Sequence, residues 1–82
     1  MRLPRDVAGD TLASLLHRYG YEQTRQTGSH LRLTTTAGGD EHHITIPRHR
    51  DLRVGTLHGI LTDVAAHLGI ERDELAEQLF GR

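Results

Sequence analysis

Hydrophobic residues recur at helical spacing near the start of the chain. They predict an amphipathic helix from about Ala8 to Tyr19, whose buried stripe consists of Leu12, Leu15, Leu16 and Tyr19. Gly20 follows the stripe and suits the left-handed residue that ends many helices, with Tyr21 folding back onto Leu16. Asp6 or Asp10 is expected to cap the start, and the sequence does not distinguish between them.

A longer pattern in the second half predicts a second helix, which begins near Gly55 and is ended by Gly69. Its apolar positions fit the helical period throughout: Leu57, Ile60, Leu61, Val64, Ala65 and Leu68. A last short helix is expected from about Arg72 to Phe80, with acidic residues in its first turn. Ile70 and Leu75 have the spacing of a hydrophobic staple at its start.

Between the helices, three segments have the composition or the alternation of strands: residues 21–27, 29–36 and 42–46. The first is polar throughout, which predicts an exposed or edge position. In the other two, leucine or isoleucine occupies every second position, so those residues face the core. The intervening residues then face the opposite way. This parity puts His30 on the open face of the sheet, beside Arg32 and near Thr45 or Pro47.

The order helix, three strands, helix, helix predicts an α+β fold of two layers. An antiparallel meander would have one face covered by two helices and the other face left open. The length of 82 residues indicates one domain spanning 1–82.

Composition adds a hint about partners. The net charge is −1, and all ten cationic residues are arginine. Five arginines and three acidic residues lie between Arg25 and His58, whereas four acidic residues and two arginines follow from Glu71. This asymmetry hints at a middle segment that faces a polyanion, but on charge alone ordinary surface scatter is the favoured interpretation. With no cysteine, no apolar run of membrane-spanning length and no signal-peptide pattern, we expect a cytoplasmic protein.

The segment Arg25-Gln26-Thr27-Gly28-Ser29-His30 is the strongest candidate for chemistry. Gly28 allows a tight reversal between two strands. Histidine can accept and donate a proton near neutral pH, and arginine binds phosphate or carboxylate oxygens. The sequence therefore predicts a site for an anionic ligand at this hairpin. On the residues alone, a solvent-facing strand residue is the favoured interpretation of His30.

Five short segments occur in this order along the chain: Tyr19-Gly20-Tyr21, the hairpin segment Arg25 to His30, Ile46-Pro47-Arg48-His49, Gly55-Thr56-Leu57 and Ile60-Leu61. Together they resemble the HicA (YcfA-like) mRNA interferase toxins over roughly Thr11 to Leu68. The resemblance implies a fold like a double-stranded-RNA-binding domain, here extended by the short C-terminal helix. It also implies an endoribonuclease of a type II toxin–antitoxin pair, an mRNA substrate, a catalytic histidine at His30 and inhibition by a HicB-type antitoxin.

RNA cleavage by its own 2′-hydroxyl needs a base, an acid and positive charge, but no metal or cofactor. His30 could be the base or the acid. Arg25 and Arg32 are candidates for holding the phosphate, and Ser29 for a hydrogen bond to it.

The basic loop after the third strand adds Arg48 as an RNA-binding residue and His49 as a second proton-transfer group or a mere bystander. The adjacent pair His42 and His43 should diverge to opposite faces, which argues against a shared metal ion. His17, His58 and His67 fall off the apolar stripes and are expected to be solvated. Two alternatives to a nuclease are a non-catalytic RNA-binding module and a protein-interaction domain.

Overall fold

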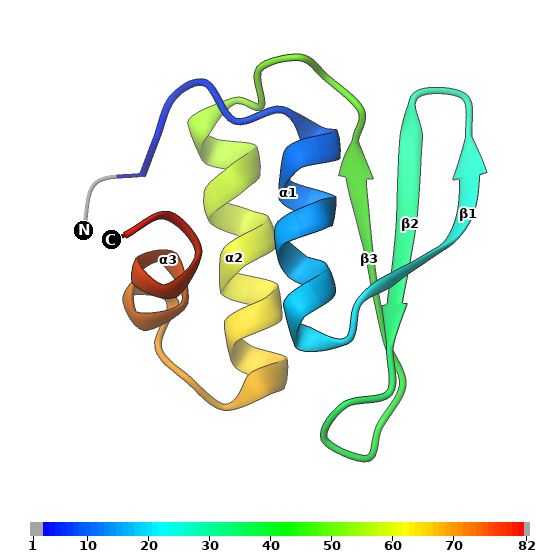
Figure 1. Cartoon of the computed structure of the whole chain (residues 1–82), viewed down its shortest axis with the longest axis vertical. Helices are drawn as coiled ribbons and strands as arrows, with labels where there is room; N and C mark the ends of the chain where they lie inside the picture. Colours follow the sequence, from blue (N-terminus) through cyan, green and yellow to red (C-terminus); the bar gives the residue numbers. More distant parts are fainter. Residues whose placement is uncertain (1–2, 82) are drawn as a thin grey trace.

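The computed structural model describes residues 3–81 of the chain. Its elements, labelled in Figure 1, are α1 (Gly9–Leu16), the 3-10 helix η1 (His17–Tyr19), β1 (Glu22–Thr27), β2 (His30–Thr35), β3 (His42–Pro47), α2 (Val54–Leu68) and α3 (Arg72–Phe80). The strands form one antiparallel sheet in the order β1-β2-β3. The predicted α+β fold, which resembles a double-stranded-RNA-binding domain, is confirmed.

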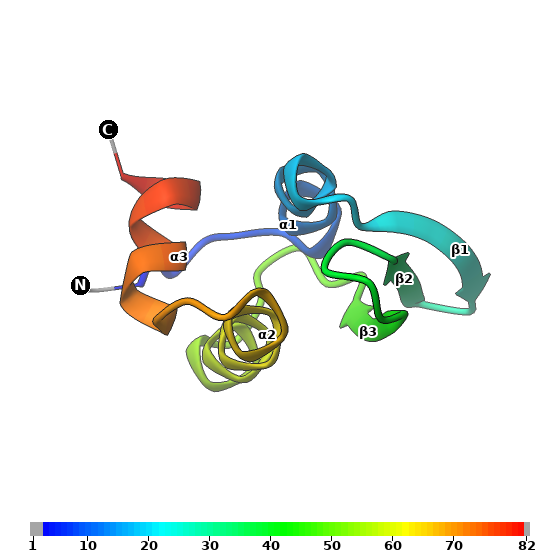
Figure 2. The ribbon, with the colours of Figure 1, turned by 90° about the horizontal axis from the view of Figure 1, so that it is seen from below.

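The helices lie together on one side of the sheet, as the two views in Figures 1 and 2 agree. α3 packs against α2 rather than against a strand. The central core contains fully buried leucine, isoleucine and valine side chains from α1, β2, β3 and α2: Leu12, Leu16, Leu33, Ile46, Leu57, Leu61 and Val64. Removing this apolar surface from water drives the packing of the two layers. None of the helices described over residues 3–81 is long and apolar enough to cross a membrane.

The first helix ends as its sequence predicts. Gly20 has a φ of 87°, and the backbone N–H groups of Gly20 and Tyr21 donate to the carbonyls of His17 and Leu16. These two bonds form a Schellman motif, which satisfies carbonyls left free at the helix end. Tyr21 is consequently turned into the core, where it is 1% exposed. β1 therefore begins one residue later than expected.

The prediction of an aspartate cap on α1 was wrong. The N-cap position is Ala8, and no side chain caps the helix. Asp10 lies in the first turn instead, where its carboxylate pairs with Arg48. A carboxylate within the first turn still interacts favourably with the positive end of the helix dipole.

The strands match the expected parity. All six residues of β1 are exposed at the edge of the sheet, whereas Leu31, Leu33, Ile44 and Ile46 are buried beneath β2 and β3. The second helix begins at Val54, one residue before the predicted Gly55. The last helix has the predicted bounds, with the staple residue Leu75 fully buried.

The expectation that His67 is solvated was also wrong. Its ring is half-buried and stacks on His42, with the centroids 4.4 Å apart and the planes 9° from parallel. Its Nε2 lies 2.9 Å from the carbonyl oxygen of Ala37. α2 thereby holds the loop between β2 and β3. A pattern analysis misses this contact because the partner residues are distant in the sequence.

Candidate functional site

A two-residue turn sets the position of His30. Thr27 and His30 are paired across β1 and β2, so Gly28 and Ser29 alone connect the strands. Gly28 has a φ of 56°, whereas no non-glycine residue of the described chain has a positive φ. Glycine at the first central position is the requirement of a type II′ turn, which suits the twist of a hairpin. The turn therefore fixes the register in which His30 begins β2.

His30 lies on the open face of the sheet, as parity predicts. Its side chain is exposed, and its partner on β3 is Pro47. Leu31, the next residue, is 3% exposed on the helix side. An exposed imidazole at the end of an uncovered face is accessible to a large ligand.

A β-bulge in β1 places Arg25 beside Arg32. Gln23 pairs with Leu33 and Arg25 pairs with Arg32, so β1 contains one extra residue, Thr24. Strict alternation would put Thr24 and Arg25 on opposite faces, yet both line the same depression on the open face. Bulges re-aim side chains in this way and are frequent near functional sites. The all-polar sequence of β1 has no hydrophobic alternation to reveal the bulge, so it was not predicted.

Arg25 and Arg32 face each other across the first two strands of the sheet. Among the described residues, neither Arg25 nor Arg32 has a carboxylate oxygen within the 4.0 Å of an ion pair, unlike Arg48 and Arg72. Like charges directly opposite on neighbouring strands destabilise a sheet. The arrangement is therefore suited to an anion that bridges the two guanidinium groups.

The depression has a volume of about 500 Å³ and is lined by Thr24, Arg25, Arg32, Thr34, Glu41 and His43. Four of these side chains form a continuous chain of hydrogen bonds. The hydroxyls of Thr24 and Thr34 are 2.9 Å apart, and that of Thr34 is 2.8 Å from Nδ1 of His43. Nε2 of His43 then lies 3.2 Å from a carboxylate oxygen of Glu41. Apart from the arginines, the sequence pattern pointed to none of these residues as site members.

The loop after β3 lies against the hairpin. The backbone N–H of Arg48 donates to the carbonyl of Ser29 at 2.5 Å, so Ser29, His30 and Arg48 belong to one corner of the molecule. The Arg48 guanidinium pairs with Asp10 at 3.1 Å, which offsets part of its charge. His49 follows as an exposed residue, and its carbonyl accepts a hydrogen bond from the N–H of Gly9.

His42 and His43 diverge as expected. His43 lies on the open face, whereas the ring of His42 turns to the helix side and contacts Tyr21 and Asp63. Gly55 and Thr56 lie within the first turn of α2, which no side chain caps.

A small antiparallel sheet with helices on one face and an open opposite face defines an α+β fold that resembles a double-stranded-RNA-binding domain. The family model described as HicA toxin of bacterial toxin–antitoxin matches residues 9–66, from the first residue of α1 into the last turns of α2. The chain therefore belongs to the HicA toxin family. A search of the curated proteins and a search of the solved structures each gave no significant match.

Proposed function

We propose that the chain is an endoribonuclease toxin that cleaves mRNA with His30 as a catalytic residue and without a metal ion. Membership of a toxin family supports the biological role. The observation that carries the chemistry is the position of His30. Its side chain is exposed at one end of the open face, two residues along β2 from Arg32, which is paired with Arg25.

The proposed reaction uses the substrate's own 2′-hydroxyl. A base removes the hydroxyl proton while the oxygen attacks the neighbouring phosphorus, and the bond to the 5′-oxygen breaks. An acid protonates that leaving oxygen, which gives a 2′,3′-cyclic phosphate and a 5′-hydroxyl end. Positive charge near the non-bridging oxygens stabilises the transition state.

The residues around His30 have complementary roles in this proposal. His30 is the base or the acid, and His49 is the candidate for the other role, because β3 ends beside the start of β2. Arg25 and Arg32 hold the phosphate. Ser29 and Arg48 add a hydroxyl and a further cation at the same corner, since their backbones are hydrogen-bonded.

A HicB-type antitoxin would silence the enzyme by covering the open face. Acidic side chains of such a partner would pair with the cations that have no ion pair among the described residues. The expected result is that bound antitoxin prevents cleavage and shields the His30 ring from a histidine-modifying reagent. A complex that is inactive while His30 reacts at the free rate would exclude this mode of inhibition.

His30→Ala tests the nuclease proposal, with His58→Ala as the matched control. His58 is an exposed histidine on α2 and not on the sheet. We expect His30→Ala to lower the cleavage rate of a single-stranded RNA by about 10²–10⁴-fold and to relieve growth arrest on overproduction. A 2′-O-methyl group at the cleaved position should block the reaction. Unchanged cleavage by His30→Ala, or cleavage of the methylated RNA, would refute the mechanism.

A further inference from the structure

The chain of hydrogen-bonded side chains on the open face remains unused by the proposed reaction. We infer that Thr34, His43 and Glu41 form a nucleoside-binding subsite for the nucleotide adjacent to the cleaved linkage, with guanosine as the best-fitting nucleoside. This inference rests on the proposed RNA substrate but concerns a different part of the face.

The strand register arranges the open face in three rows. His30 pairs with Pro47, Arg32 with Thr45, and Thr34 with His43. Each row is two residues along the strand from the next, which is ~6.7 Å and comparable with the spacing of successive phosphates in an extended RNA strand. RNA lying along β2 with its reacting phosphate held by the arginines next to His30 would thus bring the adjacent nucleoside to His43.

The four hydrogen-bonded side chains are positioned before any ligand binds. Thr24 orients Thr34, Thr34 orients His43, and His43 is joined to Glu41, each through a hydrogen bond of 2.8–3.2 Å. Solvent-exposed hydrogen bonds of this kind add little to the stability of the fold. Their effect is to hold polar atoms in fixed directions around the depression, which is what specific recognition requires.

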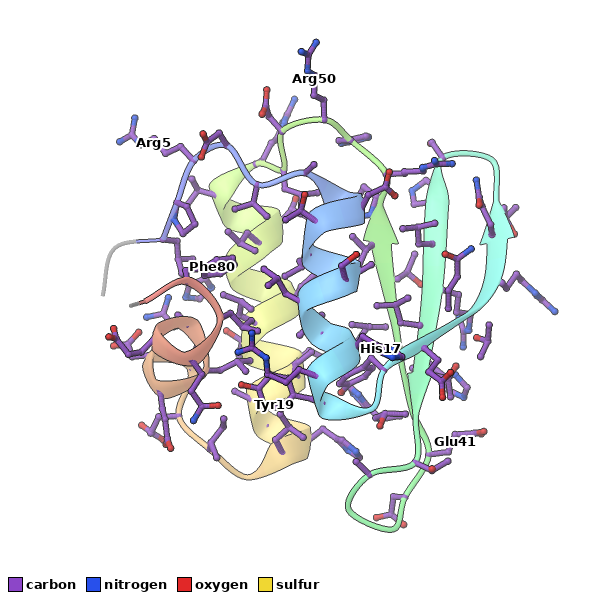
Figure 3. All side chains as sticks on the ribbon, in the orientation of Figure 1. Arg5, His17, Tyr19, Glu41, Arg50 and Phe80 are labelled. Carbon is purple, nitrogen blue, oxygen red and sulfur yellow. The ribbon has the colours of Figure 1, made fainter. Side chains whose placement is uncertain are left out.

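The charges in the depression differ between its two ends. Arg25 and Arg32 supply cations, whereas Glu41 supplies a carboxylate, and Figure 3 shows Glu41 at the end of the sheet beside the β2–β3 loop. Because a carboxylate repels phosphate, Glu41 suits a different part of the ligand. A nucleotide matches both ends of the depression: its phosphate accepts hydrogen bonds from the arginines, and its base carries N–H groups that can donate to Glu41.

Guanine satisfies the acceptor end best. A carboxylate offers about four lone-pair positions, and His43 occupies one of those of Glu41. The N1–H and 2-amino groups of guanine are adjacent parallel donors, which match the lone-pair positions of the Glu41 carboxylate that His43 leaves free. Uracil has a single N–H and no amino group. Because RNA-binding proteins read the edges of unpaired bases, the substrate is expected to be single-stranded here.

Binding to His30→Ala protein, whose cleavage is expected to be about 10²–10⁴-fold slower, tests the subsite. Fluorescence anisotropy would compare a hexanucleotide containing guanosine with one of uridine only. We expect the guanosine RNA to bind about tenfold more tightly, and Glu41→Gln to remove this preference. Thr34→Val and His43→Gln should weaken binding of the guanosine RNA about three- to tenfold.

Gln26→Ala is the control, since Gln26 lies on the same edge strand but faces the helix side, paired with Leu31. An unchanged preference in Glu41→Gln, or no preference in the parent, would overturn the subsite, as would no binding of any RNA. The outcome is separable from the nuclease proposal. If the unsubstituted protein cleaves no RNA but the guanosine preference depends on Glu41, the subsite is supported and only the nuclease proposal is refuted.

Discussion

The hydroxyl oxygen of Tyr21 lies 2.7 Å from Nδ1 of His42, and Nε2 of the same ring lies 3.2 Å from a carboxylate oxygen of Asp63. Because a carboxylate only accepts, Nε2–H donates to Asp63, and in a ring that carries this one proton Nδ1 accepts from the tyrosine hydroxyl. The chain of bonds joins the residue before β1 to β3 and α2. His42 therefore has a structural role at the boundary of the two layers, separate from the open face.

Ionisation of Tyr21 should destabilise the protein in alkaline solution. Burial, and secondarily the charge of Asp63, raises the pKa of Tyr21 from 10.0 to about 12. The folded state then holds its proton at a pH where the unfolded chain has lost it. The resulting stabilisation is fully present below pH 10 and is lost as the pH rises through about 12.

The measurement is denaturant unfolding as a function of pH, compared with Tyr21→Phe. The variant should lose this alkaline dependence, and at neutral pH it should be less stable by about 1 kcal/mol, since Nδ1 of His42 loses its partner. Tyr19→Phe is the control and should retain the dependence. Identical alkaline profiles for the parent and Tyr21→Phe would contradict the assignment.

Gly9 permits the close approach of α1 to the end of β3. A Cβ at this position would lie 2.1 Å from the carbonyl oxygen of Pro47 and 3.1 Å from Cα of Arg48. Gly9→Ala must therefore push the helix and the loop apart and weaken the Gly9–His49 hydrogen bond. We expect a loss of about 1–3 kcal/mol in the free energy of unfolding, with reduced RNA cleavage because the loop carries Arg48 and His49.

Gly59→Ala is the matched control for that variant. Gly59 is exposed within α2, and a Cβ there would meet nothing within 4 Å. Alanine should raise the free energy of unfolding by about 0.4–1 kcal/mol. Equal effects of the two substitutions would show that Gly9 is not a contact residue.

The sequence predicts the fold because its signals are local. The apolar period from Leu57 to Leu68 and the alternation around Leu31, Leu33, Ile44 and Ile46 determine which faces meet, and both patterns can be seen without knowledge of distant contacts. His30 was placed correctly on the open face for the same reason. Its position follows from that of Leu31, the neighbouring residue.

Features that depend on pairing between distant residues were not predictable. The bulge at Thr24 is a property of the β1–β2 register, because a polar edge strand gains no burial from one register over another. The stacking of His67 on His42 joins α2 to β3, 25 positions apart in the chain. The hydrogen-bonded chain through His43 likewise requires three strands to be aligned.

The facing arginines predict opposite effects on stability and binding. Arg32→Gln removes the repulsion between cross-strand neighbours and should stabilise the fold at low salt by about 0.2–1 kcal/mol. The gain should shrink as salt screens the charges. RNA affinity should fall, with a salt dependence smaller by about one phosphate contact. Thermal unfolding and binding at several salt concentrations measure both quantities.

Arg5→Gln removes the same charge from a distant place, since Figure 3 shows Arg5 beyond the helices, on the side of the molecule away from the sheet. Unlike Arg32→Gln, Arg5→Gln should leave both the stability at low salt and the salt dependence of RNA binding unchanged. Destabilisation by Arg32→Gln would mean that the arginine makes a favourable contact in the sheet.

The identity of the second proton-transfer group can be decided from the pH dependence of kcat/KM. If His30 and His49 act as base and acid, the profile is bell-shaped, because one ring must be neutral and the other protonated. His49→Ala should lower kcat/KM by about 10²–10³-fold and remove one limb. His58→Ala should preserve both limbs. A profile with one limb that His49→Ala leaves unaltered would assign the role to another group and leave His49 as an exposed loop residue.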